Sequence, residues 1–238
     1  MMGGLGQARQ RGFTIAEIAV VLAIIGVVIV AIAGGYTNLQ DAQERDRAES
    51  HGEELRAALR TFAASHGRLP CPDTSAERHG WEGDCDGDPD IHTGAAPYRT
   101  LGVARPPESR HAFYGVHRLP AASAGDDADL ARALDRTGDG RTGRPDLIRG
   151  LLNVPRAAPV PDTIHVARDA DAGCGGAIRA VAFVVIIPLA DRDGSGSRLD
   201  APHPGLCALA PASGASATND DVVITGSVLP LAAWLQKG

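Results

Sequence analysis

The sequence of 238 residues lacks the short motifs that mark many catalytic sites. No G-x-S-x-G, H-E-x-x-H or P-loop pattern is present, and no G-x-G-x-x-G follows a strand pattern and opens a helix. The eight histidines are scattered, without the spacing to a partner that proton transfer would need. We therefore assign no catalytic residue and no cofactor, and we expect a protein that is not an enzyme.

Positive charge is also scarce. The chain has 23 Lys and Arg against 29 Asp and Glu, a formal net charge of −6, and Lys237 is its only lysine. A nucleic-acid-binding protein would be expected to show a basic patch or stripe. The composition therefore argues against nucleic acid as a partner.

One long apolar stretch lies near the N-terminus. Residues 13–33 run for 21 residues with a single charged side chain, that of Glu17. As an α-helix the stretch would be roughly 31 Å long, about the thickness of the hydrocarbon core of a membrane. A carboxylate inside such a stretch is costly in lipid, so we expect Glu17 to have a function that involves a cation.

The start of this stretch carries a recognisable signal. A short basic leader ends in Gly12, Phe13 begins the apolar run, and Glu17 is the fifth residue counted from Phe13. This pattern resembles the prepilin signal of type IV pilins and type II secretion pseudopilins over residues 12–26. The resemblance implies that a prepilin peptidase cuts after Gly12 and methylates the amine of Phe13. It also implies that Glu17 pairs with the terminal amine of a neighbouring subunit during assembly, where each group supplies the charge that the other needs in lipid.

Two other interpretations of the stretch remain open. An ordinary single-pass anchor would need neither Glu17 nor the glycine–phenylalanine junction. A secretory signal peptide would explain the basic Arg9 and Arg11 and an A-x-A pattern ending at Ala33, and it would release an exported, soluble periplasmic binding or hydrolytic domain. The apolar run is, however, longer than the usual h-region of about 7–15 residues.

The chain is expected to divide at the membrane. Residues 1–12 form the leader, and residues 13–35 are predicted to be a transmembrane and assembly helix. Because Arg9 and Arg11 lie on its N-terminal side, the positive-inside rule places the leader in the cytoplasm and the rest on the periplasmic side of a bacterial inner membrane.

Residues 36–67 are predicted to be the periplasmic half of the same helix, since no proline occurs from Tyr36 to His66 and Gly67 fits a helix stop. Its apolar stripe, which predicts a face packed on a folded head, consists of Leu55, Ala58, Leu59, Phe62 and Ala63.

Residues 68–238 are expected to form a periplasmic α+β head. Strand patterns occur at residues 112–119, 163–167, 180–187 and 221–225, and short helical patterns occur at 126–134 and 228–235. The continuous apolar run at 180–187 predicts a central strand buried on both faces. The predicted fold class is thus α+β and pilin-like: a long N-terminal helix, transmembrane in its first half, packed on a small antiparallel β-sheet head with long disulfide-tied loops.

Four cysteines suit an oxidising compartment and allow three pairings. We favour Cys71 with Cys85 and Cys174 with Cys207, because each pair closes a local loop within an irregular stretch. A zinc site is disfavoured, since the cysteines and histidines lack zinc-ligand spacing.

Two acidic loops place oxygen ligands at alternate positions, as calcium loops do: residues 84–90 and 191–197. Neither has the closing glutamate of an EF-hand, and Asp-Gly sequences are also ordinary turn formers. We therefore predict no metal ligand.

The resemblance implies a structural subunit of a type IV pilus or type II secretion pseudopilus, and the large, loop-rich head favours a minor one. Expected partners are other pilin or pseudopilin subunits, the prepilin peptidase, the inner-membrane assembly platform and membrane lipid. The mature protein would reside in the inner membrane or in a filament.

Overall fold

The computed structural model describes residues 15–156, 162–167, 174, 178–203, 205–211, 216 and 218–237, without the side chains of residues 30–38 and 178. The chain divides into two compact units, Met1–Glu44 and Arg45–Gly238. Gly12 and Phe13, the predicted cleavage and methylation residues, lie outside the described residues.

Helix α1 (Ile15–His66) begins in the first unit and ends in the second. It continues through Gly34 and Gly35 without a break in helical structure. Within the described part of the chain, no helix is both long enough and apolar enough to cross a membrane. The assignment of residues 13–35 as a transmembrane helix stays a prediction.

In the second unit, α1 supplies one wall of the hydrophobic core. The predicted apolar stripe is confirmed, since Leu55, Leu59 and Ala63 are fully buried and Phe62 is nearly so. The helix ends where Gly67 adopts a left-handed conformation, with φ of +64°, and its N–H donates to the carbonyl of Ala63 at 3.0 Å. A side chain at this position would meet the backbone of Gly143, so only glycine fits.

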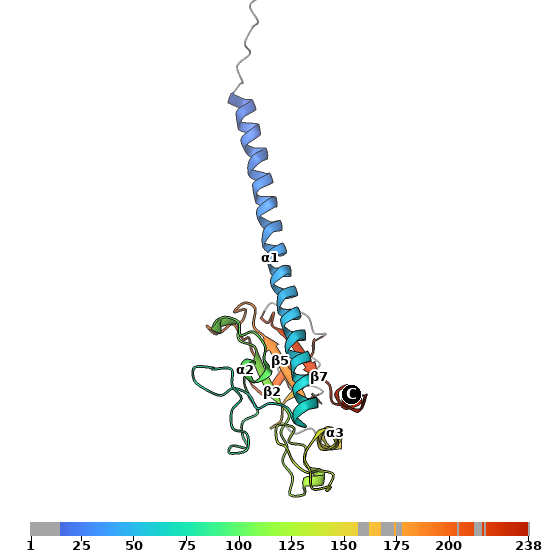
Figure 1. Ribbon diagram of the computed structural model, residues 1–238. Coiled ribbons are helices and arrows are strands. Elements are labelled where there is room, and N and C mark those ends of the chain that lie inside the picture. Colours follow the sequence, from blue (N-terminus) through green and yellow to red (C-terminus); the bar gives the residue numbers. More distant parts are fainter. Residues whose placement is uncertain are drawn as a thin grey trace, which may run out of the picture. The chain divides into compact units, whose positions relative to one another are not determined.

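A four-stranded antiparallel sheet packs against this part of α1 (Figure 1). Its strands, in spatial order, are β1 (Thr93–Ala95), β2 (Phe113–Val116), β5 (Phe183–Ile187) and β7 (Val222–Gly226). Three of the four predicted strands thus appear here, although the run at 180–187 is divided between β5 and a separate strand that ends at Ala180.

Strand β5 lies at the centre of the head and is buried on both faces, as its continuous apolar sequence predicted. Phe183, Val185 and Ile187 join the core that includes α1. Val184 and Ile186, which point the other way, belong to a second apolar cluster.

The second cluster lies between the first sheet and a smaller one. That sheet has the order β4 (Ile178–Ala180), β3 (His165–Ala167), β6 (Cys207–Leu209), with β3 antiparallel to β4 but parallel to β6. Ile164, Val166 and Ala208 contribute to the cluster from this side. The predicted α+β class is confirmed, whereas the parallel β3–β6 pair was not foreseen.

Short helices complete the head: α2 (Tyr98–Leu101), α3 (Arg144–Asn153), α4 (Val228–Lys237), η1 (Glu108–Arg110), η2 (Ala124–Asp126) and η3 (Val154–Arg156). The terminal helix α4 was predicted, and it packs against α3. Helix α3 was not predicted, and the helix predicted at 126–134 is wrong. There, the carboxylates of Asp127 and Asp129 accept backbone N–H groups two residues further on, at 2.8 and 3.1 Å, and so stabilise turns in place of a helix.

Candidate functional site

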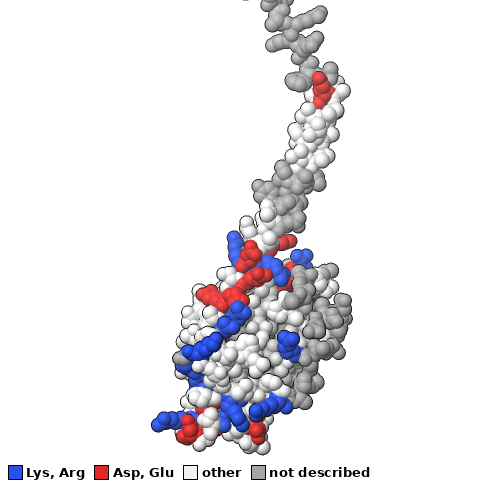
Figure 2. Space-filling view, turned by 90° about the vertical axis from the view of Figure 1, so that its right-hand side faces the viewer, with Lys and Arg blue, Asp and Glu red and all other residues white. Residues whose placement is uncertain are grey.

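The first candidate site is the exposed surface of α1 in the first unit. From Ile15 to Ile29, Glu17 is the only charged residue, and the large apolar side chains around it are about half exposed or more, with Ile15 at 88% and Leu22 at 63%. In Figure 2 this part of the helix is white, apart from the acidic side chain near its beginning. Continuous apolar surface of this kind is typical of a site covered by another molecule.

Glu17 itself lies in the first turn of α1, and its side chain is exposed. Negative charge is favoured there, because the unpaired N–H groups of a helix start carry partial positive charge. The structure thus presents one carboxylate on an otherwise apolar helical surface, which is the arrangement that the N-terminal sequence pattern predicted.

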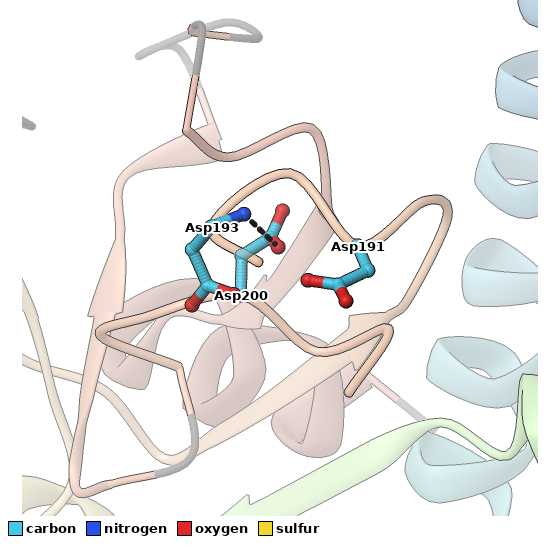
Figure 3. A group of neighbouring side chains, drawn as sticks. All are labelled: Asp191, Asp193 and Asp200. Atoms are coloured by element: carbon cyan, nitrogen blue, oxygen red, sulfur yellow. Dashed lines mark hydrogen bonds between the residues drawn. The ribbon is translucent and has the colours of Figure 1, made fainter. Parts of the chain in front are cut away.

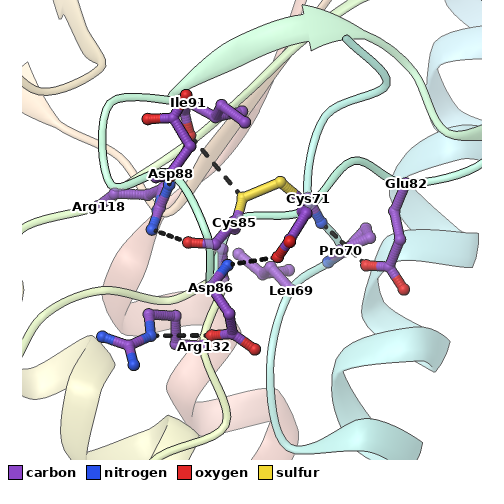
Figure 4. Close-up of a disulfide and its surroundings, with 12 residues drawn as sticks. Leu69, Pro70, Cys71, Glu82, Cys85, Asp86, Asp88, Ile91, Arg118 and Arg132 are labelled. Atoms are coloured by element: carbon purple, nitrogen blue, oxygen red, sulfur yellow. Dashed lines mark hydrogen bonds and ion pairs between the residues drawn. A yellow bond between two sulfur atoms is a disulfide. The ribbon is translucent and has the colours of Figure 1, made fainter. Parts of the chain in front are cut away.

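In the head, the cysteines are bonded in the pairs favoured from the sequence. Cys71 is bonded to Cys85 with a Cα–Cα distance of 5.8 Å, and Cys174 to Cys207 with 6.1 Å. The first bond lies in the centre of Figure 4, where Glu82 also accepts the N–H of Cys71 at 3.1 Å. Both bonds tie irregular segments to the core, which is the structural role expected of them.

Arg118 holds the loop that contains the first disulfide. It is 1% exposed, and its guanidinium forms a bidentate pair with Asp129, in which Nε donates to Oδ1 at 3.1 Å and Nη2 donates to Oδ2 at 2.9 Å. The same guanidinium donates to three backbone carbonyls of the loop, those of Cys85 at 2.7 Å, Asp88 at 2.7 Å and Ile91 at 3.0 Å. The sequence offered no sign of this buried pair, because Arg118 has no distinctive neighbours.

The first acidic loop, residues 84–90, does not gather its carboxylates. Asp84 accepts the N–H groups of Asp86 and Gly87, and Asp88 accepts that of Asp90. Asp86 is directed to Arg132, with Nε–Oδ1 at 2.9 Å. The alternating aspartates here form turns and a surface ion pair, as the turn-forming interpretation of the sequence allowed.

The second acidic loop does bring carboxylates together, with a residue that the sequence had not singled out. Oxygens of Asp191, Asp193 and Asp200 lie within 4.8 Å of one another (Figure 3). The backbone N–H of Ala201 and the Ser195 groups lower the pKa of Asp193 to about 2, so this carboxylate is ionised. Asp200 is fully buried and accepts the N–H groups of Arg192 and Asp193, at 2.8 and 3.2 Å.

A second group shares Asp200. Its oxygens lie within 4.8 Å of those of Asp220 and Asp221, the two residues that precede β7, and all three residues are buried. Asp220 pairs with Arg192, with Oδ2–Nε at 2.7 Å. Burial raises the pKa of Asp221, although a hydrogen bond from His203 acts in the opposite direction. Residues 200 and 220 are far apart in sequence, so no local pattern could have revealed this group.

Other motifs remain without a site. Residues 138–143 have the spacing G-x-G-x-x-G in front of α3, but no strand precedes them between Val116 and α3 in this described segment. A cavity of about 570 Å³ next to β1 is lined by polar loops, with Arg78, Glu108 and His111 among its residues. Ser75 and Asp73 also line this cavity, and the Ser75 hydroxyl donates to Oδ1 of Asp73.

The comparison with known proteins assigns the N-terminal part of the chain. No curated protein sequence and no solved structure matches this chain. Residues 7–33 match the family model described as the prokaryotic N-terminal methylation motif. The chain therefore carries the N-terminal signal of type IV pilins and pseudopilins.

Proposed function

We propose that this protein is a pilin-like structural subunit that is made as a membrane-anchored precursor, cut by the prepilin peptidase after Gly12, and assembled into a filament through α1. The observation that carries the proposal is the apolar, exposed surface of α1 with Glu17 as its one charge, within the segment that matches the methylation motif. Burying such a surface against identical helices would remove it from lipid or water.

In this proposal, Glu17 guides the association of subunits. After cleavage, Phe13 would carry a new N-terminal ammonium group close to the helix start. Pairing of that group with Glu17 of a neighbouring subunit would compensate both charges in an apolar surrounding, and a subunit in the wrong register would leave both uncompensated. The other proposed partners are the inner-membrane assembly platform and lipid. We propose a minor subunit, because the head is large and rich in loops.

The first experiment concerns processing. Intact mass and N-terminal sequencing of the protein from its own membranes should give a chain that begins at methylated Phe13. A chain that begins at Gly34 would contradict the proposal and support an exported soluble domain released after Ala33. A chain that retains Met1 would leave only a membrane anchor.

The second experiment concerns assembly. Glu17→Ala should leave cleavage and protein level unchanged but reduce incorporation into filaments by at least about tenfold, since a loss of about 1.4 kcal/mol per contact already has this effect. Sheared filaments and membranes would be compared by immunoblot. The matched control is Asp41→Ala, which removes an exposed carboxylate from the same helix outside the matched segment and should assemble normally. Equal incorporation of both variants would contradict the role of Glu17.

A further inference from the structure

The cavity next to β1 carries an inference that goes beyond filament assembly. It has a volume of about 570 Å³, and its walls come from β1, the beginning of β2, η1, the loop after Asp73 and the loop at 196–199. Small-molecule sites in proteins usually have volumes of about 300–1,000 Å³. Segments that are far apart in sequence thus enclose a space of the size that a small molecule needs.

Asp73 holds the loop that presents Arg78 to this cavity. Its backbone exchanges two hydrogen bonds of 2.9 Å with that of Ala95 in β1, and its carboxylate accepts the N–H of Ser75 at 2.9 Å. The Ser75 hydroxyl donates to the same carboxylate and accepts the N–H of His79 at 2.9 Å. The Ser75 carbonyl accepts the N–H of Arg78 at 3.0 Å. The hydrogen bonds of this loop are therefore used to fix its shape.

Arg78 has an unusual backbone conformation in this loop. Its φ is +47°, in the left-handed region that residues other than glycine rarely adopt. Its side chain is exposed, and the guanidinium makes no hydrogen bond or ion pair within the described part of the chain. Backbone strain of this kind often occurs at binding sites, where the side chain has a function that glycine could not perform.

A second guanidinium lines the cavity from another loop. Arg198 is half-buried, and its Nε donates to the carbonyl of Leu189 at 2.5 Å, which leaves its terminal amino groups without a partner among the described residues. The acidic residues of the lining are Asp73 and Glu108, and neither forms an ion pair with Arg78 or Arg198 within that same set of residues. Two positively charged groups thus remain available to a ligand.

His111 adds an unsatisfied donor to the lining. It is 5% exposed, and its Nε2 accepts the Nε–H of Arg105 at 3.0 Å. Because a guanidinium can only donate, Nε2 carries no proton, and its contact of 3.1 Å with the Pro106 carbonyl is not a hydrogen bond. The proton of the ring therefore lies on Nδ1, which is buried and has no acceptor among the described residues. Such a donor in a native protein calls for an explanation, and an oxygen atom bound in the cavity would supply it.

We propose that this cavity binds a small sugar that carries an oxyanion, either a carboxylate or a phosphate. Guanidinium groups recognise both oxyanions through paired N–H donors, so Arg78 and Arg198 bind the charged group. Thr74, Ser109 and Ser197 also line the cavity, and hydroxyl groups can both donate to and accept from the hydroxyls of a sugar. The head would thus bind a ligand of its own, whether or not the subunit is part of a filament.

The test is calorimetric titration of the full-length protein in detergent, at pH 7 and low salt. Digalacturonate supplies a carboxylate, glucose 6-phosphate supplies a phosphate, and cellobiose is the uncharged control. At least one charged sugar should bind, with an affinity at least about tenfold higher than that of cellobiose. The preferred sugar identifies the oxyanion. Absence of binding by both charged sugars, or equal binding of cellobiose, would overturn the proposal.

Two variants then connect the binding to the cavity. Arg78→Gly and Arg198→Gln should each weaken the binding of the charged sugar at least about tenfold. The control Arg141→Gln, which changes an exposed arginine outside the lining, should bind as the wild type does. Arg78→Gly also excludes a folding defect as the cause, because glycine adopts a positive φ without steric cost. Its melting temperature should stay within about 3 °C of that of the wild type. Unchanged affinity in both variants would show that the sugar binds elsewhere and would refute the assignment.

Discussion

Replacing Arg118 by leucine is expected to lower the free energy of unfolding by about 3–5 kcal/mol. The substitution leaves Asp129 as a fully buried carboxylate without its cation, and it removes the donor to the carbonyls of Cys85, Asp88 and Ile91. Removing one partner of a buried ion pair costs far more than the pair itself contributes, because the remaining charge cannot be solvated. Urea unfolding at pH 7.5 would measure the change.

The control is the same substitution at Arg132. This residue also pairs with an aspartate of the disulfide loop, Asp86, but the two side chains are 37% and 78% exposed. Exposed pairs contribute little, so Arg132→Leu should change stability by less than about 1 kcal/mol. Similar losses for the two variants would show that the buried position of Arg118 is not the cause.

Lowering the pH from 6.5 to 4 is expected to cost about 3 kcal/mol of stability through His117 alone. This side chain is 1% exposed, and neither ring nitrogen makes a hydrogen bond of normal geometry within the described part of the chain. Burial, together with the nearby His92, lowers the pKa of His117 to about 4, and the smaller favourable influence of the Ile164 backbone does not offset this.

The sign follows from proton binding. Between pH 6.5 and 4 the unfolded chain binds a proton at His117 and the folded chain does not, so stability falls as the pH falls through this range. Burial would raise the pKa of Glu82 and of Asp146, but the hydrogen bonds that both carboxylates accept outweigh it and hold each pKa below its ordinary value. These acids therefore lose their stabilising effect mainly at the lower end of the range. Burial raises the pKa of Asp221, so this group stabilises the folded state as the pH falls, in the direction opposite to that of His117.

The measurement is urea unfolding of the wild type and of His117→Leu at several pH values between 4 and 7.5. At pH 7.5 the variant should be close to the wild type, because the neutral imidazole makes no bond that leucine would lose. Its stability should decline less on acidification, by about 3 kcal/mol over the range. His79→Leu, which removes an exposed imidazole, is the control. Parallel curves for His117→Leu and the wild type would refute the assignment.

Elements with a strong local pattern could be predicted from the sequence. The central strand β5 is a continuous apolar run, β7 is a β-branched run that stops at glycine, and α1 carries an apolar stripe that ends at Gly67. In each of these, the residues that determine the structure lie within a few positions of one another, so periodicity and stop signals are sufficient.

Elements stabilised by distant side chains could not be predicted. The stretch that contains Asp127 and Asp129 has helical spacing, yet both aspartates pair with arginines, Asp127 with Arg136 and Asp129 with Arg118. These buried pairs favour an irregular backbone over the local helical preference. Helix α3 begins near Asp146, whose carboxylate accepts three backbone N–H groups from the preceding loop. The donors are Arg136, Thr137 and Gly143, so these contacts join separate parts of residues 136–143 to the start of the helix.

The same limit applies to the candidate sites. The N-terminal signal is contiguous, so the sequence indicated Glu17 directly. The matched segment, residues 7–33, contains Glu17, and the role of this residue stays a prediction. The acidic cluster joins Asp200 to Asp220 and Asp221, which come together only because the chain returns to form β7 beside β5. The sequence pattern at 191–197 indicates oxygen ligands within that loop, but it does not indicate Asp200, Asp220 or Asp221.

The two disulfides also set how far the chain can be stretched. A polypeptide extends by at most about 3.3–3.6 Å per residue. The bond from Cys71 to Cys85 shortcuts a separation of 14 residues, and that from Cys174 to Cys207 shortcuts 33. If the protein is pulled between the N-terminal helix and α4, its fully extended length is therefore shorter than that of the reduced chain. The first bond removes about 40 Å of this length and the second about 105 Å. A head that is mechanically unfolded would still contain two loops closed by disulfides. Reducing both bonds should increase the maximal extension of the unfolded chain by about 150 Å in a single-molecule pulling measurement.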